Sequence, residues 1–141
     1  MKQTVPGDLA RDHLEHPRNT GPWPEAVAAL PRVAGEAGSP ASGAFIRFRF
    51  ALDADRIVAI RYEVLGDPSL IAVASWLSDA LLGKDAEPAG VPAGLDIART
   101  LELERAEHGL ALLAEDAARG ALEKLRTAGR DSTGHGDSRP A

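Results

Sequence analysis

The sequence predicts an α+β domain in which helices pack on one face of a small, three-stranded antiparallel sheet. Three observations support this fold class. Apolar and polar residues alternate through 45–52 and again through 58–64, which is the pattern of two half-buried strands. Apolar residues then recur at helical spacing through 70–81 and through 110–125. A chain of 141 residues is long enough for one domain with its own core.

The first predicted element is a short helix over residues 7–15. It should end near His16, because Pro17 disfavours helical dihedrals in the residue before it. His13 and His16 are three residues apart and could share a metal ion, but two imidazoles without a third donor make a weak site. The preferred interpretation of His16 is a residue at the helix end next to Pro17, where a partly charged imidazole is favourable to the helix dipole. A loop follows, and the first strand is expected near 32–35.

The two alternating segments predict a hairpin whose register can be derived from its apolar faces. Those faces match when Phe50 pairs with Ile60 and Phe48 pairs with Tyr62. The same register sets Arg47 opposite Glu63 and Arg49 opposite Arg61. Three arginines (Arg47, Arg49 and Arg61) would then form a small basic strip on the outer face, which we interpret as solvated, with a partner-binding patch as the alternative.

Two longer helices are predicted after the hairpin. Asp67 is a favoured N-cap and Pro68 a favoured first residue, so a helix should begin there and run toward Gly83. A Gly/Pro-rich connection over 83–94 and a weaker helical segment over 95–101 come next. The last helix should end near Ala128, where Gly129 supplies a stop, and the polar remainder is expected to be disordered. The predicted organisation is one domain over 1–128 and a disordered tail over 129–141.

Composition excludes several classes of function. The net charge of −5 disfavours a nucleic-acid binder, which neutralises phosphates with Lys and Arg. The chain has no cysteine, which excludes disulfides, thiolate catalysis, thiolate zinc sites and cysteine-ligated clusters. No apolar run approaches a membrane span and the N-terminus lacks a secretory signal, so we expect a soluble cytoplasmic protein with no membrane partner.

Several strings occur in an order that is similar to a known family: DHLEHPRNTG at 12–21, GEAGSPASGA at 35–44, GDPSLIAVAS at 66–75, LLGKD at 81–85 and LAEDAARGAL at 113–122. Together they resemble the U-type iron–sulfur cluster assembly scaffolds, the family of IscU and the N-terminal domain of NifU, over roughly residues 11–126. The resemblance implies the α+β fold given above. It also implies a scaffold that holds iron or a [2Fe-2S] cluster through three cysteines with a neighbouring aspartate and histidine, brought together from three loops.

The positions that match the family's ligands have all changed. Where the family has Gly-Ser-Pro-Ala-Cys-Gly-Asp, this chain has Ser42 for the cysteine and Ala44 for the aspartate. Asp67 stands at the second cysteine, and Gly109 and Leu110 stand at the histidine and the third cysteine. None of these side chains supplies the soft sulfur donor that an iron–sulfur cluster requires. We therefore expect no cluster and no other cofactor.

The family's chaperone-binding segment, Leu-Pro-Pro-Val-Lys, would fall at 103–107, where only the leucine is retained. The chaperone contact is therefore not expected. The favoured hypothesis is a degenerate, non-catalytic relative that acts as a binding or regulatory module in iron–sulfur assembly. Its expected partner is a cysteine desulfurase or another assembly protein.

An alternative uses residues that the same loops would bring together. Ser42, Asp67 and His108 have the types and chain order of a hydrolase triad, and Asp67 with His108 could bind a harder divalent metal. Against the triad, the chain lacks a Gly-x-Ser-x-Gly elbow, and Asp67 is better used as a helix cap. A phosphate-binding role for GSPASGA at 38–44 is excluded, because the Lys-Ser/Thr of a P-loop is missing and the bend leads into a strand.

Overall fold

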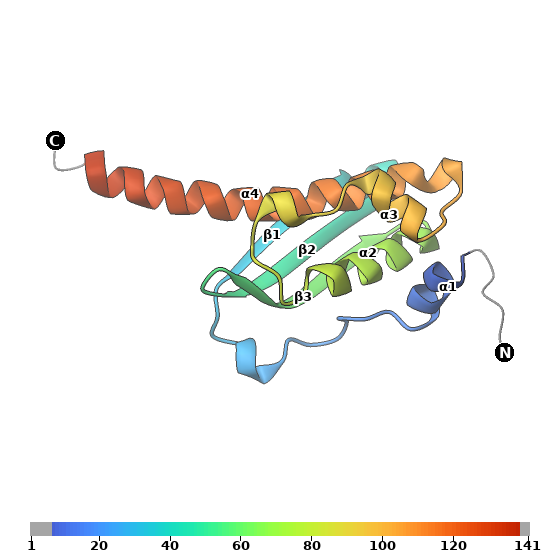
Figure 1. Ribbon diagram of the computed structural model, residues 1–141, viewed down its shortest axis with the longest axis horizontal. Helices are drawn as coiled ribbons and strands as arrows, with labels where there is room; N and C mark the ends of the chain where they lie inside the picture. Colours follow the sequence, from blue (N-terminus) through green and yellow to red (C-terminus); the bar gives the residue numbers. More distant parts are fainter. Residues whose placement is uncertain (1–6, 139–141) are drawn as a thin grey trace.

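A computed structural model describes the backbone of residues 7–138 and the side chains of residues 7–126. Figure 1 shows a sheet with helices packed along it, and the last helix projecting past the end of the sheet. The elements follow in the order α1 (Asp8–Glu15), η1 (Glu25–Val27), β1 (Arg32–Ser39), η2 (Pro40–Ser42), β2 (Ala44–Asp53), β3 (Arg56–Leu65), α2 (Pro68–Leu81), η3 (Pro88–Gly90), α3 (Gly94–Thr100), η4 (Arg105–Glu107) and α4 (His108–Ser138).

The three strands form an antiparallel sheet in the order β1-β2-β3, which confirms the predicted fold class. The predicted hairpin register is also confirmed, since Phe50 pairs with Ile60 and Phe48 with Tyr62. Alternation places Ile46, Phe48 and Phe50 on the face that the helices cover, where all three are fully buried. The main core therefore lies between the sheet and helices α2, α3 and α4.

Helix α4 lies unusually close to β1. A Cβ atom on Gly35 would overlap the backbone of Ala117 and Ala121, so only glycine permits this approach of strand and helix. The helix presents small side chains to the sheet, because its fully buried residues are mostly alanines: Ala111, Ala114, Ala117, Ala118 and Ala121. The position of α4 is consequently set by direct contact between two backbones.

The predicted end of the last helix is wrong. The helical backbone continues past Ala128 to Ser138, through most of the segment expected to be a disordered tail. Gly129 is a weak stop, since glycine inside a helix costs only about 1 kcal/mol relative to alanine. Side chains beyond Arg126 and the residues 139–141 lie outside the described part of the chain, so the disorder predicted over 129–141 stays a prediction.

The outer face of the sheet is partly covered by the segment between α1 and β1. Trp23 and Leu30 pack with Val27 on a second small cluster that includes Ala51 and Ala59. This cluster shields the part of the outer face around Ala51 and Ala59 from solvent.

The three outer-face arginines do not form an open basic strip. Arg47 and Arg49 both pair with Glu63, the first at 3.2 Å and the second at 2.5 Å. Arg61 donates to the carbonyl oxygens of Gly21 and Pro22, and its guanidinium lies over the ring of Trp23. The unfavourable Arg49–Arg61 pairing is thus relieved, because each of the two arginines has its own partner.

Among the residues that the structure describes, no helix has the length and apolar character to cross a bilayer.

Candidate functional site

The bend at 38–44 is built by its own turn chemistry. The side chain of Ser39 accepts a hydrogen bond from the amide of Ser42 at 3.1 Å, which caps the short helix η2. The hydroxyl of Ser42 donates to the carbonyl oxygen of Ser39 at 2.8 Å. Gly43 then adopts a φ of 87°, a left-handed conformation suited to glycine, and returns the chain into β2. The hydroxyl of Ser42 is therefore used within the turn.

A second loop, between β3 and α2, lies directly against this bend. Gly66 has a φ of 122°, and a Cβ atom there would collide with the carbonyl oxygen of Gly43. The adjacent Asp67 accepts from the amide of Ser69 at 2.8 Å and caps α2, as the sequence predicts. Two glycines therefore hold Ser42 and Asp67 on neighbouring loops.

The start of α4 joins the same end of the sheet. Ser69 donates to one carboxylate oxygen of Glu107 at 2.5 Å, which ties the first turn of α2 to η4. The other carboxylate oxygen of Glu107 accepts from the amide of Glu104 at 3.2 Å, completing a capping box. His108 follows, with Nε2 at 3.3 Å from the carbonyl oxygen of Leu103. The three loops that carry the predicted site residues thus meet at one end of the molecule.

The site they form is poor in metal donors. Ser42, Asp67 and Gly109 are exposed, and Ala44, His108 and Leu110 are partly exposed. The polar groups of Ser42, Asp67 and His108 each have a local backbone partner. Over the part of the chain that the structure describes, no group of three or more His, Asp or Glu side chains is arranged to hold a metal ion. A hydroxyl, a carboxylate, a methyl group and a leucine do not fit an iron–sulfur cluster, which requires anionic sulfur ligands.

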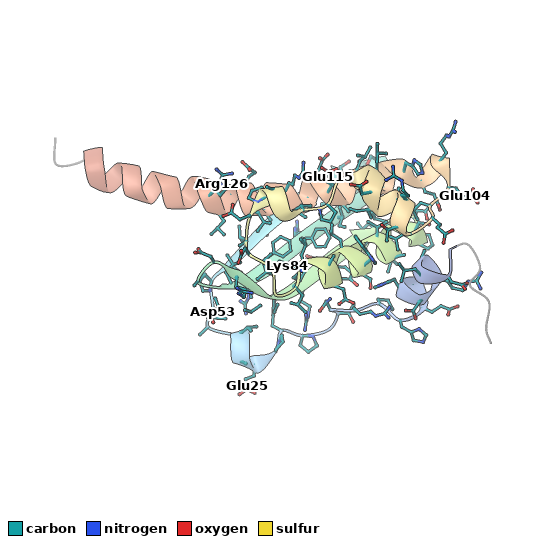
Figure 2. All side chains as sticks on the ribbon, viewed as in Figure 1. Glu25, Asp53, Lys84, Glu104, Glu115 and Arg126 are labelled. Atoms are coloured by element: carbon teal, nitrogen blue, oxygen red, sulfur yellow. The ribbon has the colours of Figure 1, made fainter. Side chains whose placement is uncertain are left out.

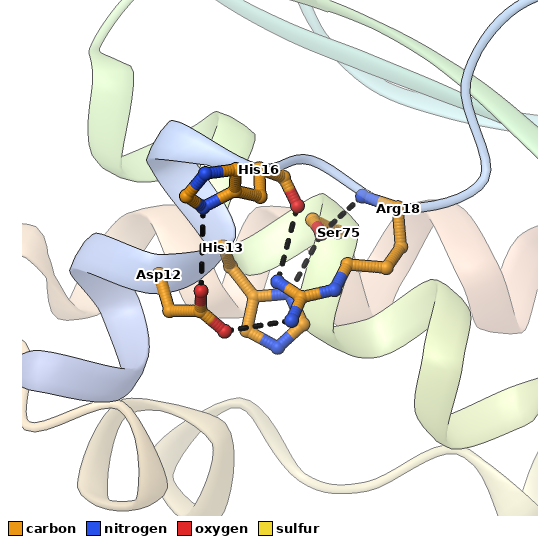
Figure 3. Close-up of polar contacts among 5 residues, drawn as sticks. All are labelled: Asp12, His13, His16, Arg18 and Ser75. Carbon is orange, nitrogen blue, oxygen red and sulfur yellow. Dashed lines mark hydrogen bonds and ion pairs between the residues drawn. The ribbon is translucent and has the colours of Figure 1, made fainter.

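A second polar cluster, which the sequence analysis missed, attaches the N-terminal segment to α2. His13 is buried, and its Nδ1 lies 2.7 Å from the hydroxyl oxygen of Ser75, which also accepts from the amide of Arg18 at 2.9 Å (Figure 3). Tyr62 donates to the carbonyl oxygen of Arg18 at 2.7 Å, and this links the segment to the sheet. Burial and the positive charge of Arg18 lower the pKa of His13, while Asp79 and Asp12 act in the opposite direction.

The outer part of this cluster is an ion network on α1. Arg18 pairs with one carboxylate oxygen of Asp12 at 2.6 Å, and His16 lies 3.4 Å from the other. The hydrogen bond and charge of Arg18 lower the pKa of Asp12 against a smaller desolvation effect. His16 is at the end of α1, as predicted, and 74% of its side chain is exposed, whereas His13 points into the protein. The two histidines therefore do not share a metal site.

One signal in the sequence could have revealed this cluster. Ser75 and Ser78 occupy positions on the apolar face of α2 and are both fully buried. Buried hydroxyls need hydrogen-bond partners, and the polar run from Asp12 to Asn19 supplies them: Asn19 donates to Ser78 at 2.7 Å. Serines on an otherwise apolar helix stripe thus indicate a polar segment docked on it.

The fold and the three converging loops agree with the iron–sulfur scaffold class that the sequence resembles. The sequence profile of the NifU-like N terminal domain matches residues 7–130, and the chain belongs to this family. It is 31% identical over 112 residues to the iron-sulfur cluster assembly scaffold protein IscU of Haemophilus influenzae, covering 79% of this chain and 87% of that protein. It is also 31% identical over 125 residues to the iron-sulfur cluster assembly enzyme IscU of Drosophila melanogaster, covering 85% and 80%.

Solved structures confirm the fold. The N-terminal part of a nitrogen-fixing NifU-like protein from Brucella abortus superposes with a TM-score of 0.59 at 15% identity, covering 85% of this chain and 93% of that one. The chain is thus an iron–sulfur cluster assembly scaffold-family protein without a single cysteine.

Proposed function

We propose that this protein does not build clusters and instead acts as a binding or regulatory module for another iron–sulfur assembly protein, with a cysteine desulfurase as the expected partner. One observation carries the proposal. The three loops are held together by glycine contacts and by the Ser69–Glu107 hydrogen bond, with no need for a metal, while the chain has no thiolate to offer a cluster. The end of the sheet where the three loops meet therefore keeps its shape, while the cysteine ligands that a cluster needs are missing.

The side chains at the positions that match the family's ligands are of the wrong chemical type to hold an iron–sulfur cluster. Iron–sulfur clusters are held by cysteine thiolates, with histidine as an occasional replacement. At the five positions that match the family's ligands, the only ionisable side chain is that of Asp67, and it caps α2. A single carboxylate leaves an iron pair almost without ligands, so a role in contact with other proteins is favoured over a role in chemistry.

The alternative, a metal site or a hydrolase using Ser42, Asp67 and His108, is not favoured. Each of the three has a partner on its own loop, and within the described part of the chain no hydrogen bond joins any two of them. A nucleophilic serine requires a base within hydrogen-bond reach, and here its hydroxyl donates to the carbonyl oxygen of Ser39.

Cluster assembly is tested by anaerobic reconstitution of the purified chain with ferrous iron and sulfide. Metal analysis and visible absorption should show no stoichiometric, protein-bound cluster. A bound cluster in stoichiometric amount would overturn the proposal, and one tightly bound metal ion without sulfide would support the alternative.

Partner binding is tested with the cysteine desulfurase of the same organism by biolayer interferometry. The change Ala41→Arg adds bulk and charge to the exposed η2 bend and should weaken binding about tenfold or more, because it disrupts the centre of the expected interface. Ala26→Arg is the matched control, an exposed alanine in the short helix η1, and should bind like the original protein.

The triple change Ser42→Ala, Asp67→Ala and His108→Ala separates an interaction module from a hydrolase or a metal-binding protein. A pure interaction module should keep its partner after this change, whereas a hydrolase or metal site would lose activity or metal. Equal binding by the two arginine variants would argue against the converging loops as the interface.

A further inference from the structure

Residues 7–19 form a strap that lies against α2, with α1 as its helical part (Figure 1). The strap contributes none of the buried residues of the main core, and Ala10 is its only half-buried side chain packed against that core. Leu9 and Leu14, the large apolar residues of α1, are 39% and 38% exposed. The strap therefore adds little apolar burial, and the core does not depend on it for packing.

Both ends of the strap are fastened by polar contacts. At its start, the amide of Gly7 donates to the carboxylate of Glu102 at 3.2 Å. At its end, the side chain of Asn19 donates to the hydroxyl of Ser78 at 2.7 Å and to the carboxylate of Asp79 at 3.1 Å. The attachment of this segment thus rests on hydrogen bonds rather than on apolar side chains.

His13 is the one side chain of the strap that is buried, and it is titratable. Its Nδ1 and the amide of Arg18 both reach the hydroxyl of Ser75, at 2.7 Å and 2.9 Å (Figure 3). The amide can only donate, so the arrangement that satisfies all three groups has the hydroxyl donate its single proton to Nδ1 of a neutral imidazole. A protonated ring would place a second donor at the same oxygen and leave the hydroxyl proton without its acceptor.

The charged groups around His13 do not compensate a proton on its ring. Asp12 is already paired with Arg18 at 2.6 Å. Burial and the charge of Arg18 lower the pKa of His13, and the opposing effects of Asp79 on α2 and of Asp12 are smaller. Tyr62, which reaches the strap from β3, is a neutral phenol whose own pKa is raised by burial. The closed strap therefore requires neutral His13.

The chain is anchored again directly after the strap. Asn19 and Gly21 both have a positive φ, 60° and 87°, so the chain turns sharply there. Arg61 then donates to the carbonyl oxygens of Gly21 and Pro22, both at 3.1 Å, which ties them to β3. Figure 2 shows the labelled Glu25 of η1, which follows this anchor, well separated from α1. An opening of the strap would therefore end near Gly21.

We propose that this strap is a pH-sensitive latch, in which protonation of His13 releases residues 7–19 from α2 and β3 while the sheet and helices α2, α3 and α4 stay folded. The opening is local, because a segment with few buried apolar contacts opens at a lower free-energy cost than the core. Release uncovers the hydroxyls of Ser75 and Ser78 on α2 and frees Glu102, just before η4. The inference goes beyond the proposed function and does not rest on it, since it concerns a conformational change of this chain alone.

The direction of the pH effect follows from the neutral ring in the closed state. Once released, His13 regains the unperturbed pKa of about 6.5. The closed state is fully favoured above that pH. Below it, the equilibrium constant for opening should rise up to about tenfold per pH unit, until the lower pKa of the closed state is reached.

The latch is tested on the full chain with a nitroxide spin label, since the chain has no cysteine and a single introduced thiol is labelled alone. Leu14→Cys carries the label on the strap, and Ala26→Cys carries it on η1, beyond the anchor at Gly21. Electron paramagnetic resonance between pH 8 and pH 5 should show the ratio of mobile to immobile label rising about tenfold or more on the strap and staying constant on η1. Far-UV circular dichroism should show that the other helices remain.

Substitutions in the Leu14→Cys chain identify the titrating group. His13→Gln should abolish the pH response, because its amide does not titrate. His16→Gln is the matched control, a change at an exposed histidine beside the same helix, and should keep the response. Ser75→Ala should give a mobile label at every pH, because it removes the shared partner of His13 and Arg18.

Three results would overturn the latch. The first is a label on the strap whose mobility does not change with pH. The second is a pH response that survives His13→Gln, which would assign the effect to the Asp12–Arg18 pair. The third is equal mobilisation of the labels on the strap and on η1 with loss of helical signal, which would show global unfolding instead of a local release.

Discussion

His13 is a residue whose charge state the fold controls. Its ring lies between α1 and α2, hydrogen-bonded to Ser75, with Arg18, Asp12 and Asp79 as the charged groups around it. Burial and Arg18 keep its pKa below the value of 6.5 for an unperturbed histidine. The folded protein therefore favours neutral His13, and protonation favours the unfolded chain.

The predicted consequence is a loss of stability in mild acid. Stabilisation by neutral His13 is fully present above the unfolded-state pKa of about 6.5 and is lost as the pH falls from there through the lower pKa of the folded state. Urea unfolding between pH 8 and pH 5 should show a flatter pH dependence for His13→Gln than for the original protein. His16→Gln, a change at an exposed histidine of the same helix, should keep the original slope. Identical slopes for both variants would contradict this account.

The three loops that meet at one end of the sheet are joined by a glycine contact and by a side-chain hydrogen bond. Gly66 faces the carbonyl oxygen of Gly43, and Ser69 reaches Glu107 before α4 begins. These contacts fix the positions of α2 and α4 relative to the bend at 38–44.

The register of the hairpin and the cap at Asp67 could be predicted, because alternation and capping are local patterns. The Gly66–Gly43 contact could not, since it depends on how close two distant loops approach.

The glycine contact predicts a specific difference between two substitutions. Gly83 also has a positive φ, 82°, but a Cβ atom there would have no heavy atom within 4 Å. Gly83→Ala should therefore lower the free energy of unfolding by about 1 kcal/mol, through backbone strain alone. Gly66→Ala should cost about 3 kcal/mol, because a collision with the backbone of Gly43 is added. Denaturant unfolding of the two variants measures the difference, and equal losses would show that the loops are not in close contact.

At the scale of the whole molecule, the fold is that of the scaffold family, and the chain has no cysteine. The fold class followed from two alternating segments and the helical stripes, and the family followed from strings spread over the chain. Sequence reasoning failed in two places. It missed the docking of residues 12–19 on Ser75 and Ser78, which depends on non-local packing. It also ended α4 too early, because glycine is only a weak helix stop.

If the scaffold geometry is intact, restoring the missing donors should restore metal chemistry. The variant Ser42→Cys, Asp67→Cys, Leu110→Cys with Ala44→Asp places thiolates and a carboxylate at the positions that match the family's ligands. We expect it to gain visible absorption and bound iron and sulfide on anaerobic reconstitution, because the three loops already meet. A variant with only Ser42→Cys and Asp67→Cys is the control and should remain colourless. A colourless full variant that is still folded would show that the loops lie too far apart for one cluster.

The contact of Gly35 with Ala117 and Ala121 has a mechanical consequence for α4. Backbone lies on backbone there, so no flexible side chain can absorb a rotation or a slide of the helix along β1. The first turn of α4 lies at the end of the sheet where the three loops meet. Helix and sheet should therefore move as one rigid unit, and anything bound along the helix would stay at a constant distance from those loops.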